Sequence, residues 1–262
     1  MKPNSELRLR PIGLITWSGL LEIKRRKDVY VLSILIGLYL VFVLVTRIVG
    51  IDSEETARFL LNLGLSVAFF LAAVLTASAA GRQLSSEWED RTIYPLLAKP
   101  VSRLEVIIGK WVAVVIAGSV VMLVLSLLTL FSVPKIAGLS YVLLGETLIA
   151  QTLSLAVLSG LVLGLSLWLS RPLVILLGIA CYSGSGIVIG ILKNRLGGGE
   201  NGILAWVIDY IPNFSLLDLC GQFTNGGDAL GILPMATLVL YGVIFAGGFL
   251  AAITWFFQRK SL

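Results

Sequence analysis

Few residues in this chain could perform catalysis, and their types and spacing exclude several kinds of site. The 262 residues include no histidine, which excludes Ser-His and Cys-His catalysis and imidazole metal ligands. Cys181 and Cys220 form neither a CxxC motif nor an obvious disulfide pair. The glycine run at 197–199 does not continue into the Gly-Lys-Ser/Thr of a phosphate-binding loop. We expect no catalytic residue, no metal site and no cofactor in this chain.

The remaining chemistry is recognition, concentrated in "EDRTIYPLLAKPVSR" at residues 89–103. Pro95 and Pro100 each disfavour helix in the preceding residue and remove a backbone donor, which predicts a short, bent helix or turn. Between the prolines, Leu96 and Leu97 stand among charged neighbours. An apolar tip with a charged rim is typical of a docking contact between proteins. An ordinary solvated loop is the alternative.

The elements that must position this segment belong to an integral membrane protein. Hydrophobic residues make up 57% of the chain and charged residues 13%, against about a quarter charged in soluble domains. Six apolar runs are long enough to cross the bilayer, and such spans must be helices when no barrel-like alternation is present. We predict an all-α fold with one domain over residues 1–262. Its spans lie near 29–50, 58–81, 106–131, 147–169, 172–193 and 233–257.

The basic residues predict the orientation. If both termini are cytoplasmic, most of the 20 Lys and Arg residues lie inside, as the positive-inside rule requires. The loop at 82–105 then faces the cytosol. The net charge of +5 fits anionic inner-leaflet lipid and needs no nucleic-acid partner. The bases left outside are Arg47, Arg58, Lys135, Lys193 and Arg195.

Two segments outside the spans have a recognisable pattern. Residues 11–27 mix apolar and basic residues after a first-turn proline, which predicts an interfacial elbow helix on the inner leaflet; a positively charged flank that only sets topology is the alternative. In the outer loop, 194–232, Trp206, Tyr210 and Phe214 recur at helical spacing. That spacing favours an interfacial aromatic belt over a substrate site.

The span centres carry no Asp, Glu, Lys or Arg. Because ion-coupled carriers place such residues near the midplane, the energy source is expected outside this chain. Glu146 and Arg47 are expected at wet outer ends, and no wide polar stripe is evident. The GxxxG pairs Gly160/Gly164 and Gly186/Gly190 favour packing inside one subunit over a dimer face.

A family resemblance follows from the residues of the hydrophilic segment. Residues 89–97, continued by 99–103 and closed by Gly109-Lys110, resemble the cytoplasmic loop of ABC-2 type ABC transporter permeases. The chain most resembles the branch associated with multicopper-enzyme maturation, similar to the nitrous-oxide reductase maturation permease. Residues 211–214, "IPNF", are similar to a segment that such permeases carry between their fifth and sixth spans.

The resemblance implies a permease that is not itself an enzyme. It implies two permease copies, as a homodimer or heterodimer, and a separate cytosolic ATPase that holds ATP and Mg, in the inner membrane of a prokaryote. Export and transmission of motion to an outer partner protein both stay open. A scaffold that binds another cytosolic protein through residues 82–105 is the alternative function.

The resemblance also assigns site residues. The coupling helix within 82–105 would dock on the ATPase through Glu87, Glu89, Asp90, Arg91, Thr92, Tyr94, Pro95, Leu96, Leu97, Pro100 and Arg103. Short outer helices would form a gate, with candidates Trp206, Tyr210, Pro212, Asn213 and Phe214.

Overall fold

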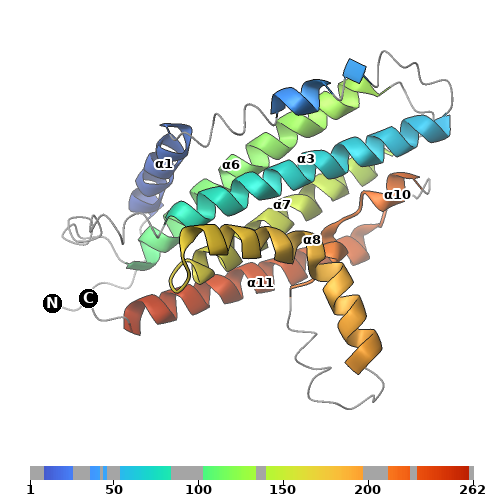
Figure 1. Cartoon of the computed structure of the whole chain (residues 1–262). Helices are drawn as coiled ribbons and strands as arrows, with labels where there is room; N and C mark the ends of the chain where they lie inside the picture. The colour runs from blue at the N-terminus through green and yellow to red at the C-terminus, as the bar shows by residue number, and fades with distance from the viewer. Residues whose placement is uncertain are drawn as a thin grey trace.

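All regular structure in the described part of the chain is helical (Figure 1). The computed structural model describes residues 9–25, 36–41, 44–45, 54–83, 103–133, 140–196, 212–224 and 229–259. The long helices are α1 (Leu9–Arg25), α3 (Glu54–Gln83), α6 (Arg103–Ser132), α7 (Tyr141–Leu165), α8 (Arg171–Leu196) and α11 (Ile232–Arg259). Two short elements, η1 (Phe214–Leu217) and α10 (Gly221–Thr224), lie between α8 and α11 in the chain.

Five described helices, α3, α6, α7, α8 and α11, are long and apolar enough to cross a membrane. They overlie the predicted spans at 58–81, 106–131, 147–169, 172–193 and 233–257. Of the first predicted span, 29–50, only residues 36–41 and 44–45 are described, and these are helical. The chain is therefore an all-helical membrane protein with five candidate spans, and the sixth span stays a prediction.

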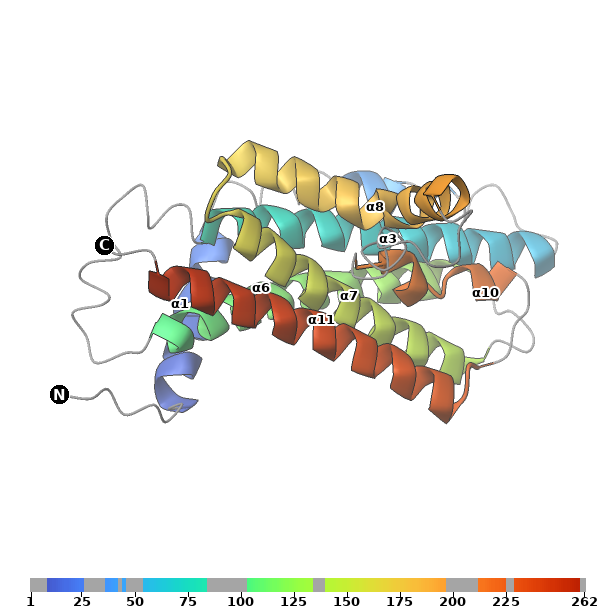
Figure 2. The same cartoon turned by 90° about the horizontal axis from the view of Figure 1, so that it is seen from below.

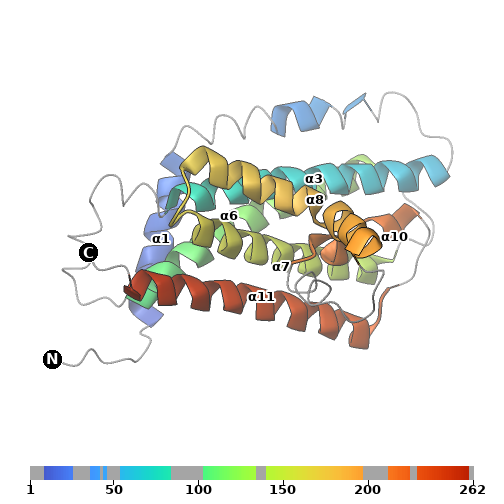
Figure 3. The ribbon, with the colours of Figure 1, turned by 60° about the horizontal axis from the view of Figure 1, so that its bottom comes forward.

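The five candidate spans alternate in direction, so that helices distant in sequence end on the same side (Figures 1 and 2). The end where α3 closes at Gln83 and α6 begins at Arg103 also holds the α7–α8 turn and the close of α11; α1 lies across it. We call this the loop end, since residues 84–102 connect there. The opposite end, which carries η1 and α10, is the cap end (Figure 3).

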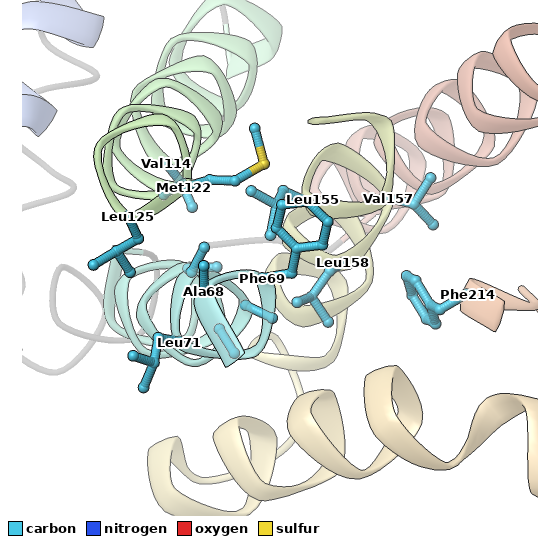
Figure 4. Close-up of a cluster of buried hydrophobic side chains, with 14 of the residues drawn as sticks. Ala68, Phe69, Leu71, Val114, Met122, Leu125, Leu155, Val157, Leu158 and Phe214 are labelled. Atoms are coloured by element: carbon cyan, nitrogen blue, oxygen red, sulfur yellow. The ribbon is translucent and has the colours of Figure 1, made fainter. Parts of the chain in front are cut away.

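The core lies where α3, α6 and α7 meet (Figure 4). Ala68 of α3, Leu125 of α6 and Leu155 of α7 are fully buried. Small residues allow the helices to approach closely, which is the main route to tight packing in lipid. A side chain at Gly160 would meet Phe249 of α11 at 3.2 Å. The Gly160/Gly164 pair therefore packs inside the chain, as the sequence indicated.

The described part of the first predicted span is anchored by Tyr39. This residue is 2% exposed, and its hydroxyl hydrogen-bonds to Thr129 of α6. The hydroxyl also lies 3.3 Å from the carbonyl oxygen of Gly64 in α3. Residues 36–41 thus pack against both helices.

The structure corrects two expectations about the fourth span. Its helix begins at Tyr141, because Ser140 caps it by accepting a hydrogen bond from Leu143 N. Glu146 therefore lies inside α7 and is only 9% exposed, instead of at a wet end. The same helix carries an uncharged polar line, all buried, that the composition of the span concealed: Thr147, Gln151 and Ser154.

Candidate functional site

The base of the 84–102 loop is described, whereas most of its predicted docking residues are not. Arg103 is the first residue of α6. The other predicted contacts lie outside the described residues, namely Glu87, Glu89, Asp90, Arg91, Thr92, Tyr94, Pro95, Leu96, Leu97 and Pro100.

Lys110 closes the base of this loop. Its Nζ donates a hydrogen bond of 2.6 Å to the carbonyl oxygen of Gln83, the last residue of α3. Lys110 is 4% exposed and Gln83 3% exposed. A charged donor on a buried carbonyl makes a stronger bond than a neutral pair does. The two helices that flank the loop are therefore held together directly beneath it.

Helix α1 crosses α6 at the same place. The Thr16 hydroxyl lies 3.1 Å from the carbonyl oxygen of Gly109. A Cβ at Gly109 would lie 2.8 Å from Ile15 Cγ2, and one at Gly19 would lie 3.0 Å from Ala113 Cβ. Two glycines, one on each helix, thus permit the crossing, and α1 forms part of the loop base.

The face of α1 away from α6 is apolar. Leu14 is 72% exposed and Trp17 64% exposed, three residues apart on one side of the helix. A helix with a packed side and an exposed side of this kind fits an interfacial position. The side chains of the basic residues 24–27 lie outside the described residues.

At the cap end, the predicted gate residues are described in part. Trp206 and Tyr210 lie outside the described residues, whereas Pro212, Asn213 and Phe214 lead into η1. The Asn213 side chain caps η1, because its Oδ1 accepts a hydrogen bond of 3.1 Å from Ser215 N. We call residues 212–224 and 229–230 the cap.

Side chains of two long helices hold the cap by its backbone. Asn213 N donates to the Tyr241 hydroxyl of α11 at 2.7 Å. Phe214 N donates to Ser185 Oγ of α8 at 3.1 Å. Both acceptors are neutral, and both satisfy backbone donors that burial would otherwise leave without a partner.

Phe214 lies inside the bundle. It is 3% exposed and points toward Val157 and Leu158 of α7 (Figure 4). Its ring is 5.7 Å from that of Tyr182. The aromatic spacing of the sequence therefore does not place Phe214 in an interfacial belt, because the cap folds back and buries this ring.

Glu146 joins the end of the cap to α7. Its Oε2 accepts a hydrogen bond of 2.8 Å from Leu230 N. The next residue, Gly231, has φ of +83°, a conformation that favours glycine. The carboxylate and the glycine together set how the chain enters α11.

Cys220 is a buried thiol within the cap. It is 1% exposed, and the Asp218 carboxylate accepts a hydrogen bond of 3.0 Å from its backbone N. Burial raises the pKa of the thiol, and the nearby Asp218 charge adds to this. A protonated, enclosed thiol reacts slowly. Within the described parts of the chain, no three Cys, Asp or Glu side chains gather to hold a metal ion.

Helix α7 links the two ends. On the α6 side, Trp111 Nε1 donates to the carbonyl oxygen of Ala156 at 3.0 Å. On the α11 side, a Cβ at Gly242 would lie 2.9 Å from Leu153 Cβ. Helix α7 is thereby in direct contact with α6, with α11 and, through Glu146, with the cap.

Sequence reasoning missed most residues of these two assemblies. Gly109 and Lys110 closed the motif used above, but their partners Thr16 and Gln83 are distant in sequence and gave no signal. Ser185 and Tyr241 are ordinary residues in apolar runs, and only the fold brings them to the cap.

Comparison with known families identifies one match. A family model described as "ABC-2 family transporter protein" matches residues 20–194. No curated protein matches the chain.

Proposed function

The chain belongs to the ABC-2 transporter family, and from this premise we propose that it is the membrane permease of an ABC transporter, driven by a separate cytosolic ATPase. Its coupling contact is the 82–105 loop, with Tyr94, Leu96 and Leu97 in a groove of the ATPase and charged neighbours setting orientation. The protein works as a dimer of permeases in a prokaryotic inner membrane, with the loop end cytosolic.

The observation that supports this most directly is the clamp at the base of the loop. Because Lys110 joins α6 to Gln83 and Thr16 joins α1 to α6, a push on the loop moves three helices together. An isolated solvated loop needs no such base. The basic ends at the loop end agree with a cytosolic position, namely Arg82, Lys110, Arg171 and Arg259.

Motion of the loop base has a path to the cap. Helix α6 holds α7 through Trp111, and α7 holds the cap through Glu146 and the packing around Phe214. ATP binding on the partner subunit would shift the loop base, and α7 would carry that shift to the outer gate. The chain itself supplies structure and no catalysis.

Copurification tests the coupling contact. The full chain with Leu96→Ala and Leu97→Ala is expected to lose its ATPase partner, because two leucines that fill a groove of the partner would contribute most of such a contact. The matched control is Leu176→Ala with Leu177→Ala, an adjacent pair that is exposed on α8. It should retain the ATPase.

Two results would contradict the proposal. If the variant with both leucines changed retains the ATPase, the 82–105 loop is not the coupling contact. Copurification of a different cytosolic protein, with no nucleotide-binding subunit, would favour the scaffold function instead.

A further inference from the structure

Element η1 rests on a seat of uncharged polar side chains. Ser185 of α8 and Tyr241 of α11 accept hydrogen bonds from the backbone of residues 213–214, and Tyr182 of α8 lies beside the Phe214 ring. Gln151 of α7 bonds to Tyr182, and Ser154 follows it on the same side of α7. We call Gln151, Ser154, Tyr182, Ser185 and Tyr241 the η1 seat. Gln151 and Ser154 are each 1% exposed, and Gln151 Nε2 donates a hydrogen bond of 2.6 Å to the Tyr182 hydroxyl.

One polar group of the seat makes no hydrogen bond to η1 or to any other described residue. The Ser154 hydroxyl is buried without a hydrogen-bond partner, and such a group ordinarily costs free energy. It follows Gln151 by three residues and so shares its side of α7. A buried hydroxyl without a partner calls for an explanation, and a bound ligand is one.

Helix α8 bends along its length (Figure 1), and its sequence contains the run Ser183-Gly184-Ser185-Gly186. Ser183 Oγ donates to the Ile179 carbonyl at 2.9 Å, a back-bond that favours bending, and glycine–serine runs are common kink sites. A Cβ at Gly186 would lie 2.8 Å from Ser215 Cβ. The part of α8 that holds η1 therefore also carries residues that favour bending of the helix.

The present occupant indicates what the seat can bind. It supplies two neutral N–H donors, from Asn213 and Phe214, and an aromatic ring beside Tyr182. None of the five seat residues is charged, and an unpaired ion would be costly there. Among the carboxylates of the long helices, Glu146 already accepts from Leu230 N, and the Asp218 carboxylate that acts on Tyr182 belongs to the cap and accepts from Cys220 N.

We propose that the η1 seat, when η1 leaves it, binds an uncharged molecule that has hydroxyl or amide donors and an apolar part. This names a substrate class for the proposed permease and rests on that function. Aromatic walls with a few placed polar groups are the usual lining of a ligand site. The unmet Ser154 hydroxyl and the two acceptors released by η1 provide the hydrogen bonds.

Thiol labelling of the full chain in lipid nanodiscs tests the proposal without the ATPase. The background carries Cys181→Ala and Cys220→Ala, and Ser154→Cys is the reporter for N-ethylmaleimide. Gly186→Ala adds a methyl group against Ser215 and should displace η1. Gly184→Ala is the matched control, because nothing lies within 4 Å of a Cβ there.

Labelling is expected to be slow in the background and in Gly184→Ala, and to rise by about tenfold or more in Gly186→Ala, because reactivity follows the open population. Phe214→Ala, which removes the buried ring, should give the same rise. Equal labelling in all four proteins, or no rise with either opening variant, overturns the proposal.

The probes are octyl glucoside and octyltrimethylammonium, which share a tail and differ in hydroxyl donors and charge. In Gly186→Ala, octyl glucoside should slow labelling severalfold and octyltrimethylammonium should not. Gln151→Leu should abolish that protection. Equal protection by both probes, or stronger protection by the cation, contradicts the substrate class. None of these results depends on ATPase binding, so they leave the coupling proposal to its own test.

Discussion

At the loop end a buried charged side chain joins two long helices, whereas at the cap end mostly uncharged side chains hold a short segment by its backbone. Lys110 and the glycine crossing of α1 over α6 leave little space for independent movement. The cap is held by separate hydrogen bonds to Ser185, Tyr241 and Glu146 and by the burial of Phe214. The proposed function and the proposed opening of the η1 seat both draw on this difference, with the loop end moving as one body and the cap detaching.

The largest expected effect is at the glycine crossing. Gly109→Val places side-chain atoms against Ile15 and the Ile12 carbonyl, so we expect about 3 kcal/mol of destabilisation from overpacking. Thermal unfolding in detergent measures it. Gly13→Val is the control, since that position of α1 has nothing within 4 Å. Equal effects of the two changes would mean that α1 does not need the close crossing.

The second largest effect is expected when the hydrogen bond from Lys110 to the Gln83 carbonyl is removed. Lys110→Met keeps the length of the side chain but leaves the Gln83 carbonyl buried without its donor, at a cost of about 2 kcal/mol. ATPase-coupled activity should fall, while labelling of Cys220 in the cap stays slow. Arg10→Met, which removes an exposed cation of α1, should change neither. Rapid Cys220 labelling in Lys110→Met would show that the Lys110 clamp, and not only the cap's own contacts, keeps the cap closed.

The Glu146 carboxylate gives a smaller effect, confined to the cap. Glu146→Ala leaves Leu230 N without its acceptor and should cost about 1–2 kcal/mol, seen as faster hydrogen exchange across residues 212–230. Glu146→Gln retains an acceptor oxygen, so its cap amides should exchange much more slowly than those of the alanine variant. If both variants behave alike, the negative charge and not the hydrogen bond holds the cap.

The smallest effect is expected when one neutral hydrogen-bond acceptor of the cap is removed. Tyr241→Phe removes the partner of Asn213 N and should weaken the cap by about 1 kcal/mol. Hydrogen exchange at the cap again measures it. Tyr141→Phe is the control, because Tyr141 is 81% exposed and should leave exchange unchanged. A matching change at the loop end would argue against a detachable cap.

Apolar length predicted the spans from the sequence because lipid requires each crossing to satisfy its own backbone. The same rule predicts nothing about the contacts between helices. The polar line Thr147–Gln151–Ser154 escaped notice because single hydroxyls and one amide scarcely alter an apolar run. Phe214 shared helical spacing with Tyr210, yet Pro212 and the cap contacts turn it into the core. The docking residues of the 82–105 loop stay a prediction.

The unequal lengths of the spans have a consequence for the surrounding lipid. Helices α3 and α6 run for 30 residues each, against 25 for α7. At 1.5 Å per residue these are roughly 45 Å and 38 Å, so the longer pair exceeds a hydrocarbon thickness of about 30 Å by the wider margin. The longer pair must tilt or project beyond the hydrocarbon. Bilayer thickness therefore acts on the tilt of α3 and α6, the two helices that flank residues 84–102. A change in the acyl-chain length of the surrounding lipid is expected to change that tilt.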